Sequence, residues 1–322
     1  MSTGGAPGGA SPPAVEISGL RKRYGSTLAV DDVSLQVQEG EIFGILGPNG
    51  AGKTTTVECA VGLRSHDAGT IRVFGLDPHR DRAALHAVVG VQLQQSALPA
   101  RLRVSEIVDM YRSFYSRPAA GDLLAAFGLG DKRRSYYDSL SGGQKQRLSV
   151  VLALIGSPRL AVLDEMTTGL DPQARHDVWD VIRGERERGA TVVLVTHFME
   201  EAERLCDRVA LIDQGRVVAV GTPEGLAEQA AGSRNLRFVP SVPFDQDVLT
   251  ALPEVEGVER QGSQVVVSGS GDLINAVVLA LANRGVHAHD LKFESFTLED
   301  AFLRLTGHHL GNGGRGPEHE FQ

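Results

Sequence analysis

A glycine-rich run that follows an apolar strand constrains the fold of this chain more than any other feature. Residues 41–46 are predicted to form a buried strand, and a helix is expected to begin near Gly52. The segment between them matches the pattern G-x-x-x-x-G-K-[ST], in which backbone N–H groups and a helix N-terminus surround a phosphate group. The run and the residue after it are Gly47, Pro48, Asn49, Gly50, Ala51, Gly52, Lys53, Thr54 and Thr55.

Two side chains of this phosphate loop, residues 47–54, suit a nucleotide bound with Mg²⁺. Lys53 is expected to reach the β- and γ-phosphates, and the hydroxyl of Thr54 is expected to ligate the metal. A glycine-rich turn without chemical consequence is the alternative, and the predicted strand and helix on either side disfavour it. The loop therefore predicts a nucleotide-binding site at the end of a strand.

The pattern along the rest of the chain indicates an α/β fold. Short Val, Ile and Leu runs alternate with segments of helical period up to about residue 222, whereas residues 98–156 have only helical character and form a helical insert. The domain that contains them is expected to span residues 14–231. Its predicted strands are residues 14–18, 29–36, 41–46, 69–74, 88–93, 160–163, 191–195, 209–213 and 216–220.

A second, smaller domain of α+β type is expected at residues 233–308. Alternating apolar and polar residues predict strands at 235–239 and 264–268, and helical periodicity predicts helices at 273–284 and 297–305. The ends of the chain, residues 1–13 and 309–322, are rich in Gly and Pro and are predicted to be disordered tails.

Composition and charge narrow the possible partners. With 32 Lys and Arg residues against 40 Asp and Glu, the formal net charge is −8, and no basic block marks a nucleic-acid surface, so no nucleic-acid partner is expected. The two cysteines, Cys59 and Cys206, are too few for a disulfide framework or a zinc cluster, which fits a reducing cytosol. No signal peptide or stretch of eighteen apolar residues is present, so another chain is expected to hold this protein at any membrane it serves.

Two further runs have the residue types of a hydrolytic site. An apolar strand at 160–163 ends in Asp164, which is placed to hold Mg²⁺ through water, and in Glu165, which suits a general base. A strand that simply leaves the core in two acidic residues is the alternative. Within the helical insert, a predicted helix begins with a second anion-binding run, for which the alternative is an ordinary helix capped by serine. This run is Ser141, Gly142, Gly143 and Gln144.

These runs, in this order, resemble the ATP-binding cassette (ABC) ATPases over about residues 14–225, and residues 141–144 match the signature segment of that family. Four more residues match family motifs. Tyr24 matches the aromatic residue that stacks on adenine, and Gln94 matches the glutamine that senses Mg²⁺ and the γ-phosphate. Asp171 matches the loop that crosses the dimer interface, and His197 matches the switch histidine. Each of these residues also has a purely structural interpretation when taken alone. Tyr24 is equally well a partly buried aromatic residue, Asp171 is equally well a helix N-cap, and His197 is equally well a core or capping residue. Gln94 is preferred over its neighbouring glutamines by the family pattern alone.

The resemblance implies an α/β P-loop NTPase cassette, with a mixed sheet core and a helical insert, that hydrolyses ATP with Mg²⁺. It also implies a homodimer in which Ser141 and Gly143 of one chain face the γ-phosphate bound by the other. The partner that this family couples to is a membrane permease, here on a separate chain and expected to dock near residues 96–115. The cassette is then expected at the cytoplasmic face of the cell membrane.

The last helical segment, Glu299 to Gly307, resembles the C-terminal extension of bacterial export ATPases of the daunorubicin-resistance type. It implies export of a small molecule such as a drug or a hydrophobic metabolite. One departure from the family is Met166, since a proline usually follows the catalytic glutamate and stiffens that loop. Two alternatives stay open, a soluble ABC ATPase acting on nucleic acid or the ribosome and a regulatory ATP-binding subunit with little turnover.

Overall fold

The computed structural model describes residues 12–93, 98–116, 118–119, 121–230, 234–294 and 296–307. Its contacts divide the chain into two compact units, here called unit 1 (residues 12–223) and unit 2 (residues 224–307). Residues 224–230 of the helix Pro223–Ala230 group with unit 2, whereas the predicted larger domain extends to residue 231. Within the described ranges, no helix is long and apolar enough to cross a membrane.

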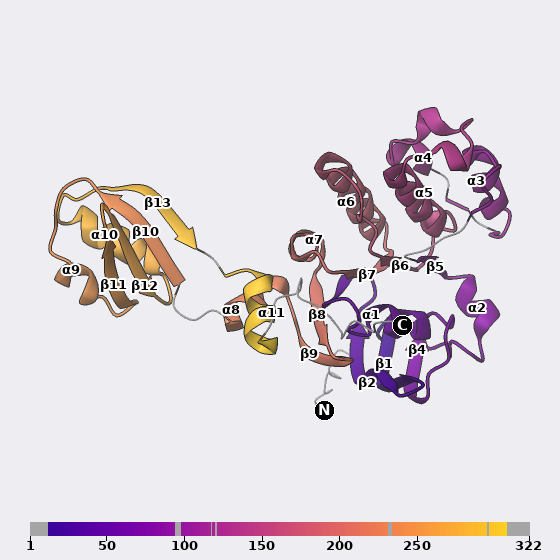
Figure 1. Cartoon of the computed structure of the whole chain (residues 1–322), viewed down its shortest axis with the longest axis horizontal. Coiled ribbons are helices and arrows are strands. Elements are labelled where there is room, and N and C mark those ends of the chain that lie inside the picture. Colours follow the sequence, from indigo (N-terminus) through magenta and orange to yellow (C-terminus); the bar gives the residue numbers. More distant parts are fainter. Residues whose placement is uncertain are drawn as a thin grey trace, which may run out of the picture. The chain divides into compact units, whose positions relative to one another are not determined.

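Unit 1 contains two sheets (Figure 1). One has three antiparallel strands in the order β2-β1-β4, and the other has six strands in the order β5-β6-β7-β3-β8-β9, of which only β9 is antiparallel to its neighbour. Every strand that the sequence predicted in this part is present. The strands are β1 (Val15–Tyr24), β2 (Thr27–Val37), β3 (Ile42–Leu46), β4 (Ala68–Val73), β5 (Val89–Gln92), β6 (Leu160–Asp164), β7 (Thr191–Thr196), β8 (Arg208–Asp213) and β9 (Arg216–Gly221).

The central strands of the larger sheet are apolar along their whole length because both of their faces are covered. Every residue of β3, β6 and β7 is buried. One hydrophobic core joins the two sheets, and it contains residues of β1, β2, β3 and helix α1 (Lys53–Ala60). The phosphate loop between β3 and α1 is therefore held on both sides by well-packed elements.

The insert predicted at residues 98–156 is helical, and its described residues contain no strand. A backbone bridge joins Arg103 to Tyr136, so the chain entering the insert lies against the chain that leads to its last helix. The helices of the insert are α3 (Val104–Arg112), α4 (Leu123–Ala126) and α5 (Gly142–Leu154), with two short 3₁₀ turns, and unit 1 also contains α2 (Arg82–His86), α6 (Pro172–Glu187) and α7 (Met199–Leu205).

After the helix α8 (Pro223–Ala230), unit 2 has the β-α-β-β-α-β order of a ferredoxin-like fold. Its antiparallel sheet has the order β11-β12-β10-β13, and α10 packs across one face over a core of its own (Figure 1). A further helix, α11, follows the sheet. The elements are β10 (Arg234–Pro240), α9 (Asp247–Thr250), β11 (Val255–Gln261), β12 (Gln264–Gly269), α10 (Leu273–Ala282), β13 (Ala288–Glu294) and α11 (Leu298–Thr306).

The α+β composition of this region matches the prediction, but neither edge strand, β11 or β13, was predicted. β11 carries charged residues on both faces and Gly257 in its middle, and β13 is interrupted at Asp290, whose φ is 49°. Their sequences therefore lack the alternation that identified the two central strands. These edge strands form because β12 and β10 offer hydrogen-bonding partners, which local propensity does not encode.

Candidate functional site

The phosphate loop leaves β3 at Leu46 and enters α1 through Gly52. Gly52 has a φ of 97°, and a Cβ on this residue would lie 2.3 Å from the carbonyl oxygen of Ala29. Only glycine fits this position, because any side chain would be strained in its backbone and would collide with that carbonyl. The loop glycine thus brings the N-terminus of α1 close to β2 and leaves its first backbone N–H groups available to an anion.

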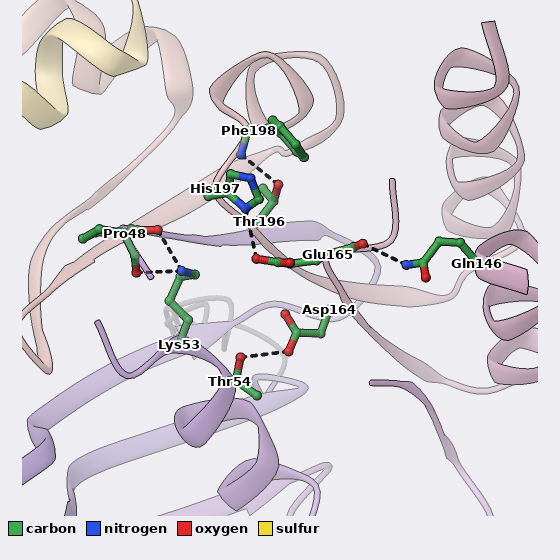
Figure 2. A network of polar contacts seen from close by, with 10 residues as sticks. Pro48, Lys53, Thr54, Gln146, Asp164, Glu165, Thr196, His197 and Phe198 are labelled. Atoms are coloured by element: carbon green, nitrogen blue, oxygen red, sulfur yellow. Dashed lines mark hydrogen bonds and ion pairs between the residues drawn. The ribbon is translucent and has the colours of Figure 1, made fainter. Parts of the chain in front are cut away.

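Lys53 is the first residue of α1 and is only 5% exposed. Its ammonium group donates hydrogen bonds to the carbonyl oxygens of Gly47 and Pro48, at 2.8 and 2.9 Å (Figure 2). Burial lowers the pKa of Lys53, and the nearby carboxylates of Glu165 and Asp164 oppose this shift. The loop therefore folds back over its own lysine and holds a positive charge at its centre.

The carboxyl ends of β6 and β7 lie at the same edge of the sheet as the phosphate loop. In the parallel register, Leu46 lies opposite Thr196, and Asp164 lies opposite Val195. Residues that follow these strands consequently meet at one crevice, as is usual for ligand sites in open α/β sheets. This topology brings Thr54 and Asp164 together, although they are 110 positions apart in the chain. The Thr54 hydroxyl donates a hydrogen bond to Oδ2 of Asp164 at 2.9 Å.

Asp164 is buried, being 1% exposed, and burial raises the pKa of its carboxyl group while the hydrogen bond from Thr54 opposes the shift. The next residue, Glu165, has a φ of 51°, which is unusual for a residue other than glycine. Its side chain turns to His197, whose Nδ1 lies 3.0 Å from Oε1 of Glu165 (Figure 2). The two acidic residues therefore face different partners, Thr54 and His197.

Glu165 also lines a pocket of about 380 Å³ beside the phosphate loop. Among the described residues that line the pocket, Ala29 is the only one with an apolar side chain, and the polar side chains and glycines suit a phosphate chain. Its walls are formed by Ala29, Asn49, Gly50, Gly52, Lys53, Thr54, Thr55 and Glu165.

The Ser141 run begins α5, as predicted, with Ser141 as the N-cap. Its hydroxyl accepts a hydrogen bond from the backbone N–H of Gln144, whose side-chain oxygen accepts one from the backbone N–H of Ser141. Ser141 and Gly142 are exposed, and a Cβ on Gly142 would have no atom within 4 Å. Gly143 instead lies against Leu170, which is 3.1 Å from a Cβ built there.

Among the described residues, Gln146 joins α5 to Glu165. Its side-chain amide donates to the carbonyl oxygen of Glu165 at 2.9 Å (Figure 2). Gln146 was not among the predicted site residues, because neither its residue type nor its place in a helix distinguishes it from a solvated glutamine. The contact depends on how α5 and β6 pack.

Comparison with known proteins places the chain in a family. A scan against family models matches residues 30–168 to the family described as ABC transporter. The chain is 39% identical over 316 residues to a Nod factor export ATP-binding protein of Ralstonia nicotianae, covering 94% of this chain and 97% of that protein. The chain belongs to the ATP-binding subunits of ABC transporters. This ABC subunit is also 36% identical to a daunorubicin resistance ATP-binding protein of Streptomyces coeruleorubidus, covering 91% of this chain and 96% of that protein.

Solved structures agree with the fold of the ABC subunit. An ATP-binding subunit of an ABC transporter aligns with a TM-score of 0.63 and 29% identity, covering 67% of this chain and 92% of that one. A dimeric ATP-binding cassette bound to ADP and Pi in a post-hydrolysis state aligns with a TM-score of 0.59 and 25% identity, covering 65% of this chain and 98% of that one. The predicted family, fold class and ATPase activity are confirmed.

The structure does not gather all the residues that the sequence assigned to the site of this ABC subunit. Tyr24 ends β1 and is 40% exposed, with Lys22 and Arg64 over its ring, and it is not among the residues that line the loop pocket. Asp171 caps α6 by accepting a hydrogen bond from the backbone N–H of Ala174 at 2.9 Å. Gln94 lies outside the described residues.

Proposed function

We propose that this ABC subunit hydrolyses ATP as one half of a homodimer and thereby drives the export of a small molecule through a membrane permease on a separate chain. The observation that carries the proposal is the convergence of the phosphate loop, Asp164 and Glu165 at one edge of the six-stranded sheet. The permease would hold the subunit at the cytoplasmic face of the cell membrane.

The choice of export, and of a drug or hydrophobic metabolite as cargo, is supported by the relatives. A Nod factor export protein and a daunorubicin resistance protein both match more than nine tenths of this chain, so the similarity includes unit 2 and not only the cassette. The permease is proposed to dock near residues 96–115, part of which lies outside the described residues. Phe114 in this segment is 69% exposed.

The residues beside the phosphate loop fit Mg²⁺. Thr54 and Asp164 present a hydroxyl and a carboxylate oxygen 2.9 Å apart, and Mg²⁺ prefers such hard oxygen ligands. We assign Thr54 and Asp164 to hold the metal, together with Gln94 as the family resemblance implies. When bound, Mg²⁺ offsets negative charge on the β- and γ-phosphates.

Other side chains of the cassette are proposed to bind the phosphates, accept the proton of the attacking water and bind the adenine ring. Lys53 exchanges its two loop carbonyls for phosphate oxygens, which is favourable because each new hydrogen bond joins opposite charges. Glu165 accepts the proton of the attacking water, and His197 orients the Glu165 carboxylate through its contact at 3.0 Å. Tyr24 stacks on the adenine ring at the exposed end of β1.

The signature segment and Asp171 are proposed to act on the nucleotide held by the second copy. The exposed first turn of α5 presents Ser141 and Gly142 outward, and its backbone N–H groups carry the partial positive charge of a helix N-terminus. Gly143 and Gln144 complete this surface. The alignment with a dimeric cassette bound to ADP and Pi supports such an arrangement.

The decisive experiment replaces the proposed general base, Glu165, with glutamine. Glu165→Gln is expected to lower kcat for ATP at least 100-fold, because removal of a general base typically costs about two to four orders of magnitude. ATP affinity, measured by isothermal titration calorimetry, should stay within about threefold of the original value, because Lys53 and the loop are unchanged.

A matched control is Glu200→Gln on α7. Glu200 is an exposed acid paired with Arg204, so its replacement should leave kcat unchanged. Normal turnover in Glu165→Gln would refute the base assignment and favour another carboxylate as the general base.

A further inference from the structure

Glu165 occupies an unusual backbone conformation that the rest of the cassette holds in place. With φ at 51°, a residue that carries a Cβ is strained, and such strain persists only where surrounding contacts fix it. The family resemblance expects a proline directly after this residue, and Met166 supplies no such restriction of φ. Met166 is instead fully buried.

Three hydrogen bonds fix the backbone on both sides of Glu165. Its N–H donates to the carbonyl oxygen of Val195 on β7 at 2.8 Å, and its carbonyl accepts from the N–H of Thr168 at 3.2 Å. The same carbonyl accepts from the side-chain amide of Gln146 at 2.9 Å. The first two bonds come from the sheet and from the local turn, whereas the third comes from a different element, α5.

We propose that Gln146 is a positioning residue that orients Glu165 for hydrolysis and ties it to the signature helix of the same chain. The proposal rests on the assignment of Glu165 as the general base. The direction of the Glu165 side chain toward His197 depends on the backbone torsions of Glu165, and the Gln146 amide opposes a change in these torsions by holding the carbonyl (Figure 2).

Helix α5, which contacts the Glu165 carbonyl through Gln146, is also the helix whose first turn is proposed to meet the nucleotide of the second copy. Gln146 lies just over one turn after the N-cap Ser141, within a single continuous helix. A second contact, between Gly143 and Leu170, joins the same turn to the loop that follows Glu165. A displacement of α5 therefore reaches Glu165 directly, so each cassette orients its own base according to the position of its own signature segment.

The test replaces Gln146 with glutamate, which keeps the length of the side chain but exchanges the donating amide for a carboxylate. The Gln146→Glu variant is expected to lower kcat for ATP at least fivefold, the change that loss of one neutral hydrogen bond produces. The KM for ATP should stay the same, since the phosphate loop is not altered, and the melting temperature should fall by no more than about 2–4 °C, the shift that loss of one hydrogen bond produces. Gln146→Ala should give a similar decrease in kcat without adding a charge.

Three comparisons distinguish a positioning role from a merely structural one. Gln36→Glu, at an exposed glutamine of β2, makes the same chemical change far from α5 in the sequence and should leave kcat unchanged. In the Glu165→Gln background, Gln146→Glu should lower the residual turnover no further. An equal additional decrease there, or a parallel change in KM and melting temperature, would overturn the positioning role.

The failure of this inference is distinct from the failure of the proposed function. Normal kcat in both Gln146 variants, together with loss of turnover in Glu165→Gln, would overturn the role of Gln146 and leave the base assignment intact. Normal kcat in Glu165→Gln would refute the base and the positioning role together.

Discussion

The phosphate loop and the signature segment are both glycine-containing starts of helices, but they differ in what the same chain places beside them. The loop faces the two carboxylates at the end of β6, Asp164 and Glu165, and Thr54 already bonds to Asp164. At the start of α5, Ser141 and Gln144 bond to each other, and Gly142 has open space around it. One helix start belongs to a site built within the chain, and the other presents its surface outward.

This difference agrees with the separate roles proposed for the two helix starts. A helix N-terminus attracts phosphate in either case, and at the loop Lys53 lies near the carboxylates of Asp164 and Glu165, which the proposed hydrolysis requires. The signature segment supplies backbone N–H groups and a hydroxyl, which suit recognition of a phosphate already held elsewhere. Substitutions at Lys53, Ser141 and Gly142 test this contrast.

The largest effect is expected from Lys53→Ala, which removes the buried cation at the centre of the loop. ATP affinity should fall about 100-fold, because a buried charge-assisted contact to phosphate is lost. Isothermal titration calorimetry with ATP and Mg²⁺ measures the change. Lys132→Ala, at a lysine paired with exposed Asp131, is the control and should bind as the original chain does. Equal affinity in both variants would contradict the central place of Lys53.

A smaller effect on binding, with a large effect on turnover, is expected from Ser141→Arg. A single chain should still bind ATP through its intact loop, but kcat should fall about 50-fold because the bulky side chain keeps the second copy away. A mixed dimer of Lys53→Ala and Ser141→Arg chains should regain one complete site, joining the loop of one chain to the signature segment of the other. ATP turnover no higher than in either parent dimer would count against action between chains.

The smallest effect is expected from Gly142→Ala. A Cβ at this position has no atom within 4 Å in its own chain, and alanine is a better helix former than glycine, so the melting temperature should stay the same or rise slightly. Turnover should nevertheless fall about fivefold, because the added methyl group meets the nucleotide on the second copy. Unchanged kcat would indicate that nothing approaches this turn. Gly143→Ala is a poorer test, since an added Cβ at this position would lie 3.1 Å from the Leu170 side chain of the same chain.

Much of the cassette was predictable because its signals are local. The buried strands β3, β6 and β7 are continuous apolar runs, the phosphate loop is a contiguous pattern, and Ser141 and Asp171 are helix caps recognisable from their neighbours. The edge strands of unit 2 were missed because their pairing partners, rather than their own residues, make them strands. The contacts group residues 224–230 with unit 2, whereas their helical pattern by itself does not show to which unit they belong.

The sequence by itself determined the family, the phosphate loop and the order of the acidic and histidine residues, because each is written in contiguous residues or in their spacing. Only the tertiary structure decided that Thr54 meets Asp164, that Glu165 faces His197 from a strained backbone, and that Gln146 holds the Glu165 carbonyl. These contacts arise where parallel strands end at one edge and α5 packs beside them. Residues far apart in the chain become neighbours there through the register of the sheet, which no local pattern records.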